Sequence, residues 1–335
     1  MDILPTGKIN LRLLSNLIEK YCVTDERVVV GPAVGEDAAV IDFGDKYLIA
    51  KTDPITFVSA HIGVYAIHIN ANDIACMGGV PKWFLASLIL PERQSTETLV
   101  DDIFSQISDT CSRLNISYCG GHTEITAGID RPIVVGCMLG EVEKDKLISS
   151  AGAEIDDHII LTKGIAIEAV SIIAREREAE ILETYSDEFI EQCKNFVYDP
   201  GISVLPEVKI AQRIGGVHSL HDPTEGGLAM GLWELASAAR VGMSIEFDKI
   251  RILPEAKLLC EQYGLDPLGV IASGALLMTA EKAASAKIVH ALKAQDIEAQ
   301  VIGRIVEAEK GVKLVINNDS YDLPRFERDE ILKIF

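Results

Sequence analysis

Long apolar runs and paired cysteine motifs are both missing from this sequence of 335 residues. No uninterrupted apolar stretch approaches the roughly 20 residues that a membrane-spanning helix needs, and the first ten residues do not have the pattern of a secretory leader. The seven cysteines are scattered, and none forms a CxxC pair. We therefore expect buried reduced thiols, and a cytoplasmic protein that is neither secreted nor held in a membrane.

Positive charge is also scarce. The chain has 31 lysine and arginine residues against 51 aspartate and glutamate residues, which gives a formal net charge of −20. A surface this acidic repels the phosphate backbone of nucleic acids, so we expect no nucleic-acid partner. A small phosphorylated ligand is still compatible with this charge, because a divalent cation can lie between acidic side chains and phosphate oxygens.

The length and the hydrophobic fraction of 48% provide enough core for two domains. Frequent glycine and few aromatic residues fit an α/β or α+β enzyme. A polar stretch without periodicity covers about residues 141–157, and we place the domain boundary at 148/149. The periodicity predicts elements on both sides of it. Helices are expected at 11–22, 64–77, 98–115 and 227–242, with a long helical region from about 165 to 193. Strands are expected at 82–90, 131–142, 243–250, 273–280 and 299–307, and residues 116–125 are expected to form a strand that runs into a glycine loop at Gly120-Gly121.

Five short stretches place carboxylates or amides beside glycine or at a predicted strand end. They are Gly35-Glu36-Asp37-Ala38, Lys51-Thr52-Asp53-Pro54, Asn72-Asp73, Gly120-Gly121-His122-Thr123-Glu124 and His221-Asp222-Pro223-Thr224-Glu225-Gly226-Gly227. Carboxylates bind Mg²⁺, which often carries phosphates with it, and glycines let backbone N–H groups approach phosphate oxygens. A GxxxxGK[ST] motif is missing, so we expect no P-loop.

Each stretch also has a plainer interpretation. The first two could be turns, the Gly120-Gly121 pair could end a strand, and Asp222 could cap the helix that begins near Gly227. Asn72 and Asp73 could lie on an exposed helix face, although both of their flanks are apolar. A buried helix with an unpaired charge is costly, and a metal ion or a hydrogen-bond network at a domain cleft would remove that cost.

In this order the stretches resemble the superfamily that contains aminoimidazole ribonucleotide synthetase, thiamine monophosphate kinase, selenophosphate synthetase and the hydrogenase maturation factor HypE. The resemblance covers nearly the whole chain and is closest to the HypE branch. It is carried by "VGEDAAV", "KTDPITF", "HINANDIACMGGVPKWFLASLILP", "LTKGIAIEAVSIIARE", "HDPTEGGLA" and "LDPLGVIASG".

The resemblance implies a PurM-like fold with an N-terminal α/β domain over residues 1–148 and a C-terminal α+β domain over residues 149–335. It implies a homodimer that pairs N-terminal sheets, with ATP and Mg²⁺ in a groove between the domains. The metal ligands would be Asp37, Asp53, Asp73 and Asp222. The cofactor would also contact Lys51, Asn72, Gly120, Gly121, Thr123, Gly226 and Gly227. His122, Glu124 and Asp222 are the candidate catalytic residues.

The chain also departs from these relatives. His122 stands where an aspartate usually follows the paired glycines, and Glu225 stands where HypE commonly has an arginine. The last cysteine is Cys260, within a predicted helix, so no tail thiol can carry a carbamoyl group as in HypE. We therefore expect a HypE-like enzyme that activates an amide, carboxylate or phosphate acceptor. The alternatives are a small-molecule kinase similar to thiamine monophosphate kinase and a non-catalytic nucleotide-binding paralogue.

Overall fold

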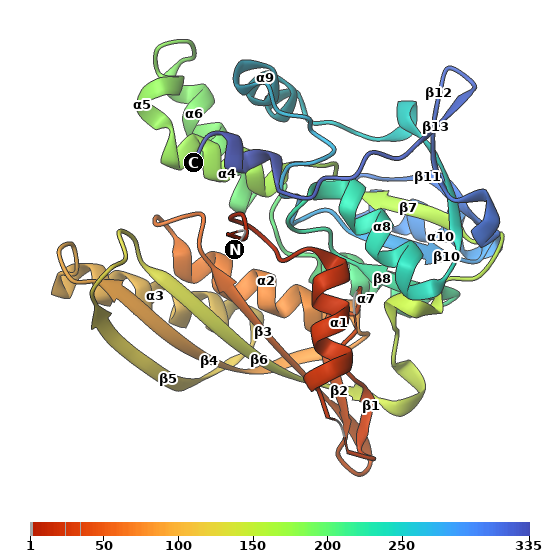
Figure 1. Cartoon of the computed structure of the whole chain (residues 1–335), viewed down its shortest axis with the longest axis horizontal. Coiled ribbons are helices and arrows are strands. Elements are labelled where there is room, and N and C mark those ends of the chain that lie inside the picture. Colours follow the sequence, from red (N-terminus) through yellow and green to blue (C-terminus); the bar gives the residue numbers. More distant parts are fainter. Residues whose placement is uncertain (1–2, 24, 34) are drawn as a thin grey trace.

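Two β-sheets, one in each half of the chain, organise the structure (Figure 1). The computed structural model describes residues 3–23, 25–33 and 35–335. Within these residues the first sheet has six strands in the order β1-β2-β3-β6-β4-β5, and β4 and β5 run parallel. The strands are β1 (Val28–Val30), β2 (Ala39–Asp42), β3 (Lys46–Ile55), β4 (Val80–Pro91), β5 (Ser117–Thr126) and β6 (Ile133–Glu143).

Helices cover one face of this sheet. Helix α2 (Ile62–Cys76) packs against β3 and β6, and α3 (Glu97–Leu114) packs against α2. Along β6, buried side chains such as Val134 and Met138 alternate with half-exposed ones such as Val135 and Leu139, because successive strand residues point to opposite faces. The buried set faces α2. Helix α1 (Leu11–Tyr21) lies in front of the sheet in the view of Figure 1.

The second sheet is covered on both faces. In the described part of the chain its order is β13-β12-β9-β11-β7-β10-β8. The strands are β7 (His158–Thr162), β8 (Val217–His221), β9 (Gly242–Glu246), β10 (Leu277–Ala280), β11 (Ala299–Val306), β12 (Val312–Ile316) and β13 (Asp319–Asp322). Leu277 packs in a cluster with α8 (Gly227–Ala239), whereas its neighbour Met278 packs with α7 (Leu205–Ile214) and α10 (Lys282–Lys293).

A group of helices joins the two halves. It consists of α4 (Ile167–Glu176), α5 (Glu178–Ile181), α6 (Asp187–Lys194) and α9 (Pro254–Tyr263). Residues of α2 and α4 belong to one hydrophobic cluster, and the hydroxyl of Tyr65 on α2 donates to Ser171 on α4 across 2.8 Å. The two halves therefore share a core, which fixes the geometry of any site between them.

The predicted two-domain fold is confirmed, with some local corrections. The long helical region expected from about 165 to 193 is divided into three helices, because Arg177 leaves helical geometry between α4 and α5, and α6 begins only after the Ser186 cap. The glycine loop expected at Gly120-Gly121 is wrong, since β5 continues through both residues. The boundary at 148/149 stays a prediction; β6 ends at Glu143 and β7 begins at His158.

Two other sequence expectations can be compared with the structure. The cysteines at 76, 111, 193 and 260 are buried and free, as expected, but Cys22 and Cys119 are exposed. Among the described residues, none of the helices combines the length and the apolar character that crossing a bilayer requires.

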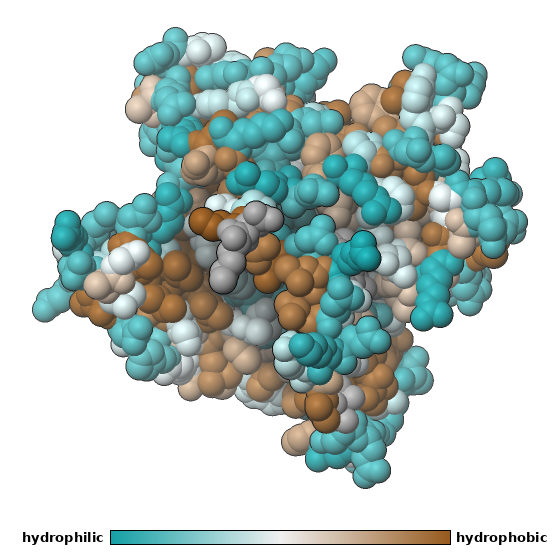
Figure 2. Space-filling view, in the orientation of Figure 1, coloured by the Kyte–Doolittle hydropathy of each residue, from teal (hydrophilic) through white to brown (hydrophobic). Residues whose placement is uncertain are grey.

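The uncovered face of the first sheet predicts a homodimer. Trp83, Leu85 and Ile89 on β4, and Val135 and Leu139 on β6, are only half-buried there. Figure 2 shows apolar residues gathered on the part of the surface that the first half of the chain forms. An apolar face and an exposed edge strand of this kind favour pairing with a second copy.

We therefore expect light scattering at micromolar protein to give about twice the chain mass of 36.4 kDa. Leu85→Lys should produce monomers, because it places a charge in the middle of the face. Ile155→Lys, at an exposed position outside the sheet, should leave the mass unchanged. A wild-type mass of one chain would contradict the prediction.

Candidate functional site

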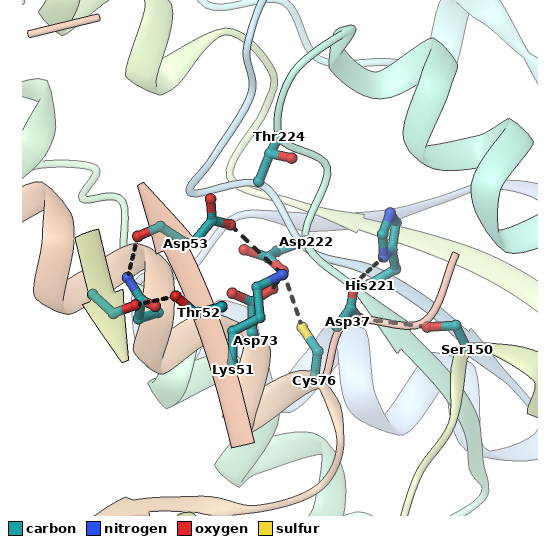
Figure 3. Close-up of polar contacts among 12 residues, drawn as sticks. Asp37, Lys51, Thr52, Asp53, Asp73, Cys76, Ser150, His221, Asp222 and Thr224 are labelled. Carbon is teal, nitrogen blue, oxygen red and sulfur yellow. Dashed lines mark hydrogen bonds and ion pairs between the residues drawn. The ribbon is translucent and has the colours of Figure 1, made fainter. Parts of the chain in front are cut away.

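Acidic side chains from three segments meet between the two halves of the molecule (Figure 3). Asp37 lies just before β2, Asp73 and Cys76 lie on α2, and Asp222 directly follows β8. All four residues are buried. One ligand atom from each of Asp37, Cys76 and Asp222 lies within 4.8 Å of the others. Helical spacing of three places Asp73 and Cys76 on the same face of α2, so a single helix face delivers both to this point.

Lys51, on β3, supplies a positive charge to the cluster. Its Nζ lies 3.2 Å from Oδ1 of Asp73 and 3.6 Å from Oδ2 of Asp53. Burial disfavours the charged lysine, but the carboxylates of Asp73 and Asp53 outweigh burial and raise its pKa. Lys51 is therefore a fixed cation that offsets part of the negative charge of the cluster.

His221 links the cluster to α8. Its Nδ1 lies 2.8 Å from Oδ1 of Asp37, and its Nε2 lies 3.1 Å from Oε2 of Glu234. Burial opposes the imidazolium, but the two carboxylates outweigh it and raise the His221 pKa well above its usual value. The protonated ring donates to both carboxylates, so it holds Asp37 in one orientation.

Two carboxylates of the cluster remain incompletely satisfied. Oδ2 of Asp73 and Oδ2 of Asp222 are buried and have no hydrogen-bond partner among the described residues. Burial, together with the neighbouring Asp37, raises the pKa of Asp222 to about 7. Burial also raises the pKa of Asp73, although Lys51 opposes the shift. Buried carboxylates that lack partners carry a large desolvation cost, which a cation between them would offset.

These residues fit a divalent cation that prefers oxygen ligands. Mg²⁺ takes carboxylate oxygens together with waters and phosphate oxygens, and Asp37, Asp73 and Asp222 provide the carboxylates. Cys76 is less suited to Mg²⁺, because thiolate is a soft ligand. Burial and the adjacent Asp222 also raise the pKa of its thiol, whose Sγ lies 3.6 Å from Oδ1 of Asp222. Cys76 therefore remains a neutral neighbour of this site.

The structure brings together five of the residues that the sequence selected: Asp37, Lys51, Asp53, Asp73 and Asp222. It places Asn72 elsewhere. Nδ2 of Asn72 donates to the carbonyl of Ile202 across 2.9 Å, and its Oδ1 accepts from the amide of Val204 across 3.0 Å. Asn72 therefore joins α2 to the second half of the chain, and its contact with the cofactor stays a prediction.

Gly226 and Gly227 also have other roles. The amide of Gly226 donates to Oδ2 of Asp329 across 2.7 Å, and the amide of Gly227 donates to the carbonyl of Thr224 across 3.0 Å. Neither amide is free to cradle a phosphate. A side chain at Gly227 would meet the carbonyl oxygens of Leu268 and Val270, so close packing at the start of α8 requires glycine there.

The remaining predicted residues lie on the edge strand β5, away from the cluster within one chain. Between β3 and β5 lie β6 and β4, which corresponds to about 14 Å at ordinary strand spacing. Gly120, Gly121 and Thr123 are exposed there. His122 and Glu124 contact each other across 3.2 Å, with side chains 67% and 51% exposed. Gly121 is needed because a side chain would collide with the Ala86 carbonyl of β4.

Two contacts at the site were not expected. Glu234 lies 13 residues after its partner His221, and the only sequence signal for it is one acidic residue in the apolar helix "GLAMGLWELASAA". Nζ of Lys8 donates to Oγ1 of Thr224 across 2.9 Å. This contact joins the N-terminal segment to the loop after β8, and no local pattern predicts it.

Comparison with known proteins agrees with this geometry. Residues 35–142 match the N-terminal domain of AIR synthase related proteins, and residues 154–316 match the C-terminal domain of the same family. The chain belongs to the AIR synthase-related family. The resemblance found in the sequence is thereby confirmed.

Individual relatives point to the HypE branch of the family. A "Putative hydrogenase expression/formation protein" from Methanocaldococcus jannaschii is 29% identical over 332 residues, covering 95% of this chain and 94% of the relative. A carbamoyl dehydratase HypE from Cupriavidus necator is 29% identical over 258 residues, covering 76% and 70%. A crystal structure of HypE in complex with ATP has a TM-score of 0.73 at 19% identity, covering 97% and 94%; this likeness confirms the fold.

Proposed function

We propose that this protein is an ATP- and Mg²⁺-dependent enzyme, similar to HypE, that transfers the γ-phosphoryl group of ATP to an oxygen of an amide, carboxylate or phosphate acceptor. The proposal rests on the buried carboxylate cluster, where Oδ2 of Asp73 and Oδ2 of Asp222 have no partner in the described residues. The location between the two halves supports it, as does the ATP complex of a HypE with the same fold.

The proposed roles follow from the geometry. Asp37, Asp53, Asp73 and Asp222 would hold Mg²⁺, which would neutralise phosphate charge and polarise the transferred group. Lys51 orients Asp53 and Asp73 through its two ion pairs. His221 fixes Asp37 in the same way.

His122 and Glu124 have no proposed catalytic role at the cluster of their own chain, because both lie on the exposed edge strand β5. Catalysis would come from positioning and electrostatic stabilisation at the buried cluster rather than from a strong covalent nucleophile.

Nucleotide affinity should depend strongly on Mg²⁺. Carboxylates that face one another also repel phosphate oxygens unless a cation lies between them. We expect calorimetry to show ATP binding at least about tenfold weaker in EDTA than in excess Mg²⁺, which corresponds to about 1.4 kcal/mol. Asp130→Asn, at a position whose side chain is 86% exposed, should keep the full dependence. Equal affinities in EDTA and Mg²⁺ would contradict the proposed metal site.

A non-catalytic nucleotide-binding role is the second candidate. The remote position of His122 and Glu124 favours it, because neither candidate acid or base lies beside the cluster of its own chain. Phosphate release from ATP separates the two functions. An enzyme releases phosphate from ATP when its acceptor is present. A binding protein holds Mg-ATP and releases no phosphate with any acceptor tested.

A further inference from the structure

The carboxylate cluster contains a soft ligand that Mg²⁺ does not need. Cys76 is completely buried on α2, and Figure 3 shows its thiol pointing toward Asp222. The thiol donates to Oδ1 of Asp222, with 3.6 Å between Sγ and the oxygen. One ligand atom from each of Asp37, Cys76 and Asp222 lies within 4.8 Å of the other two. Two carboxylates and a thiol therefore converge on one point inside the protein.

The spacing of these atoms suits a tetrahedral cation. Zn²⁺ binds thiolate sulfur at about 2.3 Å and carboxylate oxygen at about 2.0–2.2 Å, so two such ligands of a tetrahedral ion lie about 3.5 Å apart. The separation of 3.6 Å between Sγ of Cys76 and Oδ1 of Asp222 is close to this value. The two side chains therefore accommodate Zn²⁺ between them without a large movement of either.

A second observation points independently to a cation beside the thiol. Asp222 is 2% exposed, and its Oδ2 has no hydrogen-bond partner among the described residues. A buried carboxylate oxygen of this kind carries a large desolvation cost, which a bound cation offsets. Asp37 is already oriented, because Nδ1 of His221 lies 2.8 Å from its Oδ1. A partner that fixes a ligand in this way strengthens metal binding.

The thiol decides which cation these ligands prefer. Mg²⁺ takes oxygen ligands, whereas thiolate selects softer ions such as Zn²⁺. When Zn²⁺ binds, the S–H bond of Cys76 breaks, a Zn–S bond forms and the proton passes to the solvent. Lys51 and His221 lie close to the Asp222 carboxylate, and their positive charges offset part of the negative charge that the thiolate adds.

We propose that Asp37, Cys76 and Asp222 form a site for a sulfur-preferring divalent cation, Zn²⁺ in particular, and that this ion excludes Mg²⁺ from the carboxylates that the two ions share. The Zn²⁺ site depends only on the geometry of the three side chains. Its consequence, inhibition of ATP turnover by Zn²⁺, rests on the proposed function. Because Asp37 and Asp222 serve both ions, binding is competitive, and the thiolate gives Zn²⁺ the higher affinity.

X-ray absorption at the zinc edge tests the ligand set directly. The whole protein is loaded with equimolar Zn²⁺ in the absence of nucleotide. We expect a sulfur neighbour at about 2.3 Å from the zinc, together with oxygen neighbours at about 2.0–2.2 Å. Cys76→Ser keeps the size of the side chain and should remove the sulfur neighbour. It should also weaken Zn²⁺ binding by about 100-fold or more, measured by competition with a chelating dye, because a direct ligand is lost.

Control variants separate this site from thiols at the surface. Cys22 and Cys119 are exposed, and the variant in which both are serine should keep the sulfur neighbour and the wild-type Zn²⁺ affinity. Cys76→Ala provides a second test if Cys76→Ser does not fold. The inference is overturned if zinc in the wild type has no sulfur neighbour, or if a folded Cys76 variant keeps it. Loss of the sulfur neighbour from the Cys22→Ser/Cys119→Ser variant would overturn it as well.

Competition with Mg²⁺ keeps this inference distinguishable from the proposed function. Excess Mg²⁺ should weaken the apparent binding of Zn²⁺ to the wild type, and equal Zn²⁺ affinity with and without Mg²⁺ would reject the exclusion of Mg²⁺. Zn²⁺ should inhibit ATP turnover at a concentration about tenfold or more lower in the wild type than in Cys76→Ser. Normal Mg-ATP binding without a zinc–sulfur contact rejects the Zn²⁺ site alone. A zinc–sulfur contact without Mg-ATP binding rejects the proposed function and leaves the Zn²⁺ site in place.

Discussion

Asp222→Asn and Asp73→Asn should each lower ATP turnover by at least about 100-fold, because loss of a direct metal ligand should cost more than the roughly 10- to 100-fold typical of residues that only support ligands. Asparagine keeps the volume of aspartate and removes the charge that would hold the cation. Steady-state phosphate release, with acceptor present, measures the effect. Asp130→Asn, in an exposed loop, is the matched control and should turn over normally.

A measurement of folding stability distinguishes the loss of a metal ligand from general damage to the folded structure. Burial raises the pKa of Asp222 in the folded protein to about 7, from its usual value of 3.8. The native state therefore loses stability as the pH rises from about 4 to 7, since the unfolded chain releases the proton first. Asparagine does not ionise, so the Asp222→Asn variant does not lose stability in this way as the pH rises. Without Mg²⁺ at neutral pH, it should unfold at the same or a higher denaturant concentration than the wild type. Normal turnover in both aspartate variants would show that these residues are structural.

Lys51→Met should lower the free energy of unfolding by about 3 kcal/mol or more in EDTA, the loss expected when one partner of a buried ion pair is removed. Asp73 is then left buried beside Asp222 without its nearest cation. Because Mg²⁺ can replace the missing positive charge, millimolar Mg²⁺ should recover part of this loss. Urea denaturation with and without Mg²⁺ measures both effects.

Lys46 provides the control on the same strand. It pairs with Glu141 and Glu143 at the surface, where its side chain is 45% exposed. Lys46→Met should therefore cost less than about 1 kcal/mol and should gain nothing from Mg²⁺. If both lysine variants lose the same stability, or if Mg²⁺ rescues neither, the cluster does not hold a cation in the folded protein.

The sequence could identify the acidic cluster because a charge in an apolar segment is expensive. Asp73 interrupts the apolar helix α2, which is buried on nearly all sides, and that cost requires a compensating partner. The same reasoning cannot distinguish the role of Asn72 from that of Asp73. Adjacent residues on a helix point about 100° apart, so Asp73 reaches Lys51 while Asn72 reaches the backbone at Ile202 and Val204.

Other parts of the site depend on contacts that a sequence cannot reveal. His221 and Asp37 are 184 residues apart in the chain, and they meet only because the end of β8 faces the segment before β2. The Gly120-Gly121 pair suits a loop as well as a strand. Its geometry is decided by the parallel pairing of β5 with β4, in which Gly121 lies against Ala86.

Crystals grown with Mn²⁺ and a non-hydrolysable ATP analogue provide the most direct test of the central claim. Mn²⁺ replaces Mg²⁺ at oxygen sites and gives an anomalous diffraction signal. The account predicts an anomalous peak within about 2.0–2.3 Å of carboxylate oxygens of Asp37, Asp73 or Asp222, with the terminal phosphates of the analogue bound to the same ion beside Lys51. Nucleotide phosphates bound elsewhere, with no anomalous peak at this cluster, would contradict it.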